Sequence, residues 1–136
     1  MTYMRVCAYH IIMIGQIEKM KALGDETRLR IVRLLLKAGV QLCVCEIECI
    51  TGKPQYAISR ALGVLRNARL VVEERDGKLV KYGIVTDGEF AQKLFDTVAS
   101  IKCADVPSFS QDVKNIKKVL AKRDENGKPV AWCGCQ

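Results

Sequence analysis

LCVCEIECITGKPQYAISR, residues 42–60, is the stretch that decides the fold. It predicts a short helix at about residues 43–50, a turn at 51–53 and a second helix at about 54–68, where Pro54 fits the first position because its missing N–H costs nothing there. The spacing of the second helix places three side chains on a buried face: Ile58, Leu62 and Leu65. Two helices joined by a tight turn that contains glycine are typical of a helix-turn-helix.

A hairpin pattern follows the second helix directly. Residues 70–74 and 79–85 are rich in β-branched side chains, and Asp76-Gly77 between them is a strong hairpin signal. A hairpin in this place forms the wing of a winged helix-turn-helix. The sequence therefore predicts a fold that is mainly α with a small β-hairpin.

Helical patterns flank this unit on both sides. Residues 11–23 have helical spacing, and Asp25 is a good N-cap for a helix that Gly39 ends. The basic side chains of that helix fall largely outside its buried stripe: Arg28, Arg30, Arg33 and Lys37. A later helix, capped by Thr86 or Asp87, has an apolar face so broad that we expect it to pack on a second copy of the chain, giving a homodimer.

These patterns divide the chain into three parts. Residues 1–104 form the winged helix-turn-helix domain for DNA binding and dimerisation, 105–122 hold a C-terminal amphipathic helix, and 123–136 form a flexible tail with two cysteines. Pro107 is expected to break the helical pattern, so that the last helix runs over about residues 111–122.

The composition suits a DNA-binding protein of the cytoplasm. The 136 residues include 22 basic and 15 acidic side chains, a formal charge of +7 that favours a polyanion partner, although a basic surface also serves solubility. Seven cysteines, with two pairs separated by a single residue, are unlike a disulfide framework, so we expect reduced thiols. The apolar segment 6–14 is shorter than the roughly 20 residues of a membrane span and lacks a signal-peptide cleavage pattern, so it is expected to begin the first helix.

The second helix and the hairpin carry the groups that reading DNA requires. Base edges are read by side chains that form paired hydrogen bonds, and phosphates by basic or polar groups. The candidates in the first two turns of the helix are Gln55, Tyr56, Ser59 and Arg60. The candidates for phosphate or minor-groove contacts are Lys53, Arg75, Lys78 and Lys81. The order helix, turn, helix and basic hairpin makes DNA binding the main expectation.

Three cysteines precede the DNA-reading helix: Cys43, Cys45 and Cys49. Thiolates select soft or borderline cations, and three sulfurs suffice for a trigonal site around As(III) or Sb(III). A structural zinc site usually shows two Cys-x-x-Cys pairs, which this sequence lacks. Cys45 and Cys49 share a helical face, whereas Cys43 and Cys45 are about 200° apart on a regular helix. Both bind one ion only if the first turn is unwound or lies outside the helix, so we expect metal binding to distort the helix start.

Three motifs carry a family resemblance: residues 42–47 (LCVCEI), 22–31 (ALGDETRLRI) and 58–66 (ISRALGVLR). They resemble, in this order, the metal box, the second-helix entry and the recognition helix of the ArsR/SmtB family of winged-helix metalloregulatory repressors. The resemblance covers about residues 17–101. It implies a homodimer that represses an operon at an inverted repeat of double-stranded operator DNA and leaves the DNA when metal binds. It favours the arsenic-responsive (ArsR) branch, with As(III) or Sb(III) as inducer.

The third ligand differs from the family pattern. In the arsenic-responsive branch a third cysteine commonly follows the second by three positions, where this chain has Glu48, and Cys49 comes one place later. In the cadmium and lead branch N-terminal cysteines join the Cys-Val-Cys pair, so Cys7 is the alternative third ligand, including from the other subunit. A zinc site on the dimer helix is not expected, because residues 87–101 contain no histidine. The roles of three cysteines stay open: Cys103, Cys133 and Cys135.

Two other functions compete with arsenic sensing. One is a repressor that responds to Cd(II), Pb(II) or Zn(II) through Cys7, Cys43 and Cys45. The other is a DNA-binding regulator that senses oxidants through a disulfide, although a ring closed by Cys43 and Cys45 would be strained. An enzyme is not expected, because the sequence has neither a Cys-x-x-Cys motif nor a cysteine followed six residues later by arginine.

Overall fold

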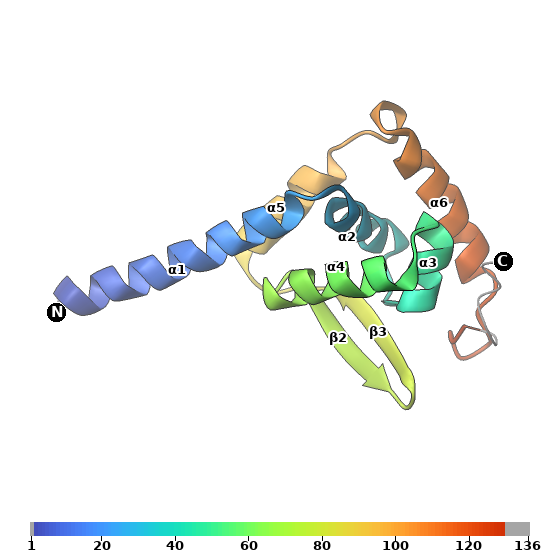
Figure 1. Cartoon of the computed structure of the whole chain (residues 1–136), viewed down its shortest axis with the longest axis horizontal. Coiled ribbons are helices and arrows are strands. Elements are labelled where there is room, and N and C mark those ends of the chain that lie inside the picture. The colour runs from blue at the N-terminus through green and yellow to red at the C-terminus, as the bar shows by residue number, and fades with distance from the viewer. Residues whose placement is uncertain (1, 130–136) are drawn as a thin grey trace.

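The computed structural model describes residues 2–129, with the side chains of residues 7–129, as a mainly helical fold with one small antiparallel sheet (Figure 1). The helices are α1 (Thr2–Leu23), α2 (Glu26–Ala38), α3 (Val44–Thr51), α4 (Gln55–Asn67), α5 (Glu89–Ala99) and α6 (Pro107–Leu120). The strands are β1 (Leu42–Cys43), β2 (Val71–Asp76) and β3 (Leu79–Ile84), and a 3-10 helix spans Cys103–Asp105. The predicted fold class, a mainly α winged helix-turn-helix with a small hairpin, is confirmed.

The helix-turn-helix consists of α3 and α4. The turn is made at Gly52, whose φ of 72° favours glycine and whose N–H donates to the Glu48 carbonyl at 2.8 Å. α4 begins at Gln55, one residue later than predicted, because Pro54 is extended (φ −67°, ψ 154°) and stands just outside the helix. The predicted buried face of α4 is confirmed for all three side chains: Ile58, Leu62 and Leu65.

The predicted wing is present as β2 and β3, which pair from Val71 opposite Ile84 to Asp76 opposite Leu79. The sequence did not predict β1, which pairs with the other edge of β3 and makes the strand order β1-β3-β2. Its two residues are too few for a strand pattern, so the segment is read as the start of a helix. As a result, the sheet physically joins the wing to the residue that begins α3.

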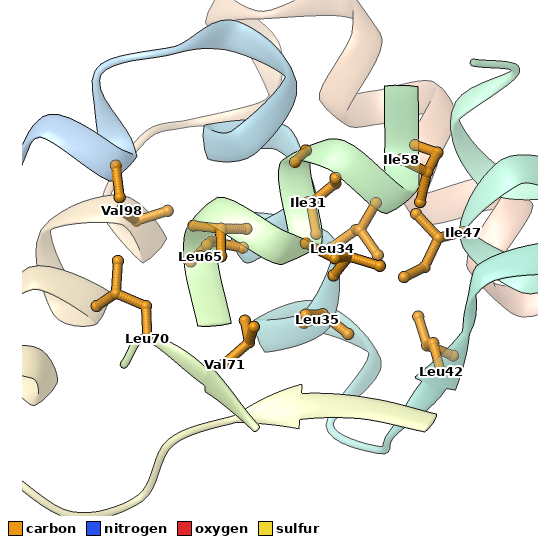
Figure 2. Close-up of a cluster of buried hydrophobic side chains, with 14 of the residues drawn as sticks. Ile31, Leu34, Leu35, Leu42, Ile47, Ile58, Leu65, Leu70, Val71 and Val98 are labelled. Atoms are coloured by element: carbon orange, nitrogen blue, oxygen red, sulfur yellow. The ribbon is translucent and has the colours of Figure 1, made fainter. Parts of the chain in front are cut away.

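α2 lies in the middle of the core. Figure 2 shows Ile31, Leu34 and Leu35 of α2 close to the buried side chains of the neighbouring elements. The labelled neighbours come from β1, α3, α4, α5 and the start of β2: Leu42, Ile47, Ile58, Leu65, Leu70, Val71 and Val98. Complete burial of each such side chain contributes roughly 1.5–3 kcal/mol. This core holds α4 by one face and leaves its opposite face for another partner.

Arg33 on α2 does not lie outside the buried stripe as predicted, because only 4% of it is exposed. Its guanidinium donates to the Val98 carbonyl and to the Cys103 sulfur, both at 3.1 Å, and lies 4.6 Å from the centre of the Phe109 ring. Phe109 belongs to α6, more than seventy positions away, so the pattern of α2 alone could not reveal this cover.

Two helix starts also differ from the predictions. α5 begins at Glu89 after Gly88, whose φ is 93°, so neither Thr86 nor Asp87 is its N-cap. α6 begins at Pro107, which was expected to break the pattern. Proline is favoured at a first helical position because the N–H that it lacks has no partner there.

α1 extends away from the rest of the chain (Figure 1). It is one helix of 22 residues that includes the apolar segment 6–14. Many of its large apolar side chains are exposed: Tyr9, Ile11, Ile12, Met13, Ile14, Ile17 and Met20. No helix within residues 2–129 is long and apolar enough to cross a membrane.

The first residues of the expected tail form a closed turn. Arg123 and Pro129 pair in an antiparallel bridge. Between them, an Asp124 carboxylate oxygen accepts hydrogen bonds from the backbone N–H groups of Asn126 (2.9 Å) and Lys128 (2.7 Å). We call residues 121–129 the C-terminal clasp. Cys133 and Cys135 lie outside the described residues.

Candidate DNA-binding surface and thiol site

The predicted reading side chains of α4 share one exposed face. They are Gln55, Tyr56, Ser59 and Arg60, and all are exposed to solvent. Positions one, four and five residues apart fall on the same side of a helix, opposite the buried face described above. Tyr56 is 76% exposed, although it is a large aromatic side chain. An apolar ring held in solvent next to an arginine and a serine is suited to contact with another molecule.

The wing adds basic groups beside this face. Arg75 and Lys78 are exposed near the tip of the hairpin, whereas Lys81 on β3 and Lys53 in the turn before α4 are half-buried. The acidic side chains of β2 are engaged by groups of the chain itself: Glu73 by Arg66, Glu74 by Gln41 and Asp76 by Lys128. These contacts leave the positive charge of the wing to dominate near its tip.

Cys43 and Cys45 meet at the junction between β1 and α3. Cys43 is extended (φ −88°, ψ 164°) and stands outside the helix as its N-cap, while Cys45 lies in the first turn. Their sulfur atoms are 2.9 Å apart. Of the two arrangements expected to allow joint binding, the structure has the one with the first thiol outside the helix, so the pair converges without distortion of α3.

Glu46 links this pair to the C-terminal clasp. Only 1% of Glu46 is exposed, and its Oε1 accepts hydrogen bonds from the Cys43 backbone N–H (3.1 Å) and the Cys43 thiol (3.3 Å). The Arg123 guanidinium donates to both Glu46 carboxylate oxygens at 2.8 Å and to the Gln41 carbonyl at 2.6 Å. A buried carboxylate is thus satisfied by a bidentate arginine and by the strand end that carries the first thiol.

Sequence reasoning missed Glu46 and Arg123. A glutamate three positions after a helix cap is a known signal, in which the glutamate returns a hydrogen bond to the cap N–H. The usual pattern has serine or threonine at the cap, and Cys43 fills that place here. No local signal points to Arg123, which is 77 positions from Glu46.

The surroundings of Cys43 favour its thiolate. The pKa of Cys43 is lowered chiefly by the hydrogen bond with Cys45, and burial opposes this effect by disfavouring the charged form. A hydrogen bond from the Glu46 backbone lowers the pKa further, while the nearby Glu46 carboxylate raises it. The thiolate is the form of cysteine that binds metals, so the pair is suited to a soft cation.

The structure does not bring the other described cysteines into this pair. Cys49 is half-buried and disulfide-bonded, Cys7 is exposed on α1, and Cys103 accepts the hydrogen bond from Arg33. Within residues 2–129, no group of three or more cysteine, histidine or acidic side chains is arranged to hold a metal ion. A disulfide sulfur is not a thiolate, so Cys49 could act as a ligand only after reduction.

Comparisons with known proteins match this chain to regulators of transcription. A family model described as bacterial regulatory protein, arsR family, matches residues 25–72. The arsenical resistance operon repressor of Escherichia coli (strain K12) is 44% identical over 66 residues, which cover 48% of this chain and 56% of that protein. An uncharacterized HTH-type transcriptional regulator of Methanocaldococcus jannaschii is 43% identical over 70 residues, which cover 52% of this chain and 78% of the relative.

Two further matches concern a cadmium regulator and a solved structure. A CadC homolog of Staphylococcus aureus, a cadmium resistance transcriptional regulatory protein, is 34% identical over 76 residues, covering 56% of this chain and 60% of the homolog. The crystal structure of the transcriptional repressor BigR from Xylella fastidiosa has a TM-score of 0.56 at 28% identity, with 77% of this chain and 95% of that chain covered. The chain spans just over half the length of the arsenical repressor that it matches.

Proposed function

The chain belongs to the ArsR family of bacterial regulatory proteins, which are DNA-binding transcriptional regulators and not enzymes, and we propose that it represses an operon until As(III) or Sb(III) binds. The observation that carries the proposal is the contact between the Cys43 and Cys45 sulfurs, 2.9 Å apart, directly before the helix-turn-helix. A pair of converging thiols selects soft cations. The name of the Escherichia coli relative supports a metalloid as the inducer.

The DNA-binding surface would be the exposed face of α4 together with the wing. In this arrangement α4 enters a major groove, where Gln55 and Arg60 can read base edges by paired hydrogen bonds, and Ser59 and Tyr56 contact bases or phosphates. Lys53 at the start of α4, and Arg75, Lys78 and Lys81 of the wing, would bind phosphates or the minor groove. The net charge of +7 supports such a polyanion partner.

We propose a homodimer formed through α1. Ile11 and Ile14 are 69% and 48% exposed on a helix that leaves the body of the chain, and a second copy would remove them from water. A hollow of about 390 Å³ lies between α1 and the start of α5, with Ile11, Ile12 and Phe90 among its walls. The second copy would also fill this hollow. A twofold dimer then requires an inverted repeat in the operator.

Metal binding would act on α4 and on the wing at the same time. Cys43 pairs with Lys81 of β3, and Cys45 is in the first turn of the helix that precedes α4. A metal ion that moves these two sulfurs from contact to bonding geometry therefore displaces the base of the wing and the start of the helix-turn-helix. Because DNA binding depends on the relation between α4 and the wing, such a shift releases the operator.

The test is a mobility shift on the promoter of the operon that contains the gene. The protein should shift the DNA, and arsenite should dissolve the complex. The variant Cys43→Ser/Cys45→Ser should bind the same DNA with similar affinity and no longer respond. Release of the double variant by arsenite would sink the proposed site, and wild-type protein that stays on the DNA in arsenite would sink the inducer assignment.

A second candidate is a repressor that responds to Cd(II) or Pb(II), with Zn(II) less favoured. The cadmium regulator homolog among the relatives supports it, as does the exposed Cys7 on α1, which the second subunit of a dimer could bring to Cys43 and Cys45. Release by cadmium but not by arsenite, lost in the variant Cys7→Ser, is the result that would favour it.

Thiol redox sensing is the third candidate, supported by the contact between Cys43 and Cys45 and by the disulfide at Cys49. Peroxide should then dissolve the DNA complex in the presence of a metal chelator. An arsenite response under the same reducing conditions, without any peroxide response, would exclude redox sensing as the signal.

A further inference from the structure

We propose that the C-terminal cysteines, Cys133 and Cys135, supply the thiolate that completes the site begun by Cys43 and Cys45; this inference rests on the proposed function. As(III) takes three sulfurs, and residues 2–129 place only two free thiols in contact. The third ligand must therefore come from a residue that is not yet beside the pair. Three observations on the described residues favour the chain end.

The first observation is the state of the other cysteines. Cys7 lies on the extended α1, and Cys103 is bound by the buried Arg33. Cys49, one turn beyond Cys45, is already bonded to another sulfur, while the remaining four described cysteines are free thiols. The sequence has seven cysteines, so two more sulfurs are available, at positions 133 and 135.

The second observation is that the C-terminal clasp returns the chain to the thiol pair. Arg123 holds the buried Glu46, whose carboxylate also bonds Cys43, and it bonds the carbonyl of Gln41 just before β1. On the other side of the clasp, Lys128 lies 3.6 Å from the Asp76 carboxylate on the wing. Residues 123–129 therefore cross between the start of α3 and the wing.

The third observation is reach. Pro129 is paired with Arg123, and the Arg123 guanidinium touches the carboxylate that touches Cys43. Paired residues of an antiparallel bridge have Cα atoms about 4.5–5.5 Å apart. Cys133 follows Pro129 by four positions, and an extended chain spans at most about 3.3–3.6 Å per residue, or roughly 14 Å. That length is comparable with one bridge plus one arginine side chain.

The binding step balances without an oxidant or reductant. Arsenous acid, As(OH)₃, exchanges three hydroxyl groups for three cysteine sulfurs, so that three As–O bonds break and three As–S bonds form. Each thiol proton leaves with a hydroxyl group as water, and arsenic remains As(III). Gly134 between the two cysteines lets the backbone adopt conformations that other residues resist, so either thiol could turn toward the pair.

The test uses the full chain, reduced with a phosphine so that all cysteines are thiols, and loaded with one equivalent of arsenite. X-ray absorption should show three As–S bonds in the wild-type protein. In the variant Cys133→Ser/Cys135→Ser it should show two As–S bonds and one As–O bond, with affinity for arsenite at least about tenfold lower. The control variant Cys7→Ser/Cys103→Ser should keep three sulfurs.

The outcomes separate this inference from the proposed function. DNA binding without arsenite should be equal in wild type and the tail variant, which also shows that the tail variant folds. If the tail variant keeps three sulfurs and full affinity while Cys49→Ser loses one sulfur, the inference is overturned and arsenite sensing stands. If the wild-type protein binds no arsenite, or binds it without Cys43 and Cys45, the proposed function itself fails.

Discussion

At the scale of residues, Glu46 is where the thiol pair and the end of the chain meet. Its buried carboxylate has one partner from each side, the backbone of Cys43 and the guanidinium of Arg123, whose side chain is 14% exposed. A carboxylate removed from water needs both partners, because an unpaired buried charge is strongly unfavourable. The pair therefore fixes the geometry at Cys43 more than it adds net stability.

The variant Arg123→Met should lower the free energy of unfolding by about 3–5 kcal/mol, because it leaves the buried Glu46 carboxylate without its cation. Urea denaturation at neutral pH measures the change. The control is Lys93→Met, which breaks the exposed pair with Glu89 on α5 and should cost less than about 1 kcal/mol. Equal effects of the two variants would show that Glu46 reaches solvent or finds another partner.

At the scale of elements, the turn between α3 and α4 depends on a single glycine. Gly52→Ala should destabilise the protein by about 1–2 kcal/mol, the cost of a side chain in the left-handed region that Gly52 occupies. Gly63→Ala is the matched control, since Gly63 lies inside α4 with open space around it, and alanine should stabilise the helix by roughly 0.5–1 kcal/mol. Thermal unfolding of both variants checks the opposite signs.

The wing supplies a second prediction at this scale. Lys78 is exposed at the hairpin turn, and if it contacts a phosphate, Lys78→Met should weaken operator binding about equally for all sequences and reduce the salt slope of log K by about 1. Lys93→Met on α5 removes the same charge far from α4 in the sequence and should leave the slope unchanged. Identical slopes for wild type and Lys78→Met would remove Lys78 from the DNA-binding surface.

Elements with strong local signals were predictable from the sequence, and elements defined by distant contacts were not. Gly52 and Asp76-Gly77 announced the turn and the wing, because their backbone conformations favour those residues. β1 could not be predicted, since its two residues become a strand only by pairing with β3, nearly forty positions later. The thiol pair was predicted, but its contact at 2.9 Å follows from that same pairing, which holds Cys43 outside α3.

At the scale of the whole molecule, the exposed apolar side chains of α1 call for a second copy. The variant Ile11→Glu/Ile14→Glu should be monomeric in sedimentation equilibrium, with helical circular dichroism retained, because both side chains lie outside the described core. Operator affinity should fall steeply, since one monomer reads only half of an inverted repeat. Tyr56→Glu, which removes an exposed apolar ring from α4, should weaken DNA binding and leave the mass unchanged. A dimeric double variant would place the interface elsewhere.

The central position of β3 gives the sensor control over order as well as over position. An isolated two-stranded hairpin is only marginally stable in water, and the wing gains its third strand from Leu42 and Cys43 alone. A ligand that pulls Cys43 away from Lys81 would therefore let the wing fluctuate, and a fluctuating wing pays conformational entropy each time it docks on DNA. Amide hydrogen exchange in β2 and β3 should then accelerate on arsenite binding, while exchange in α2 stays slow.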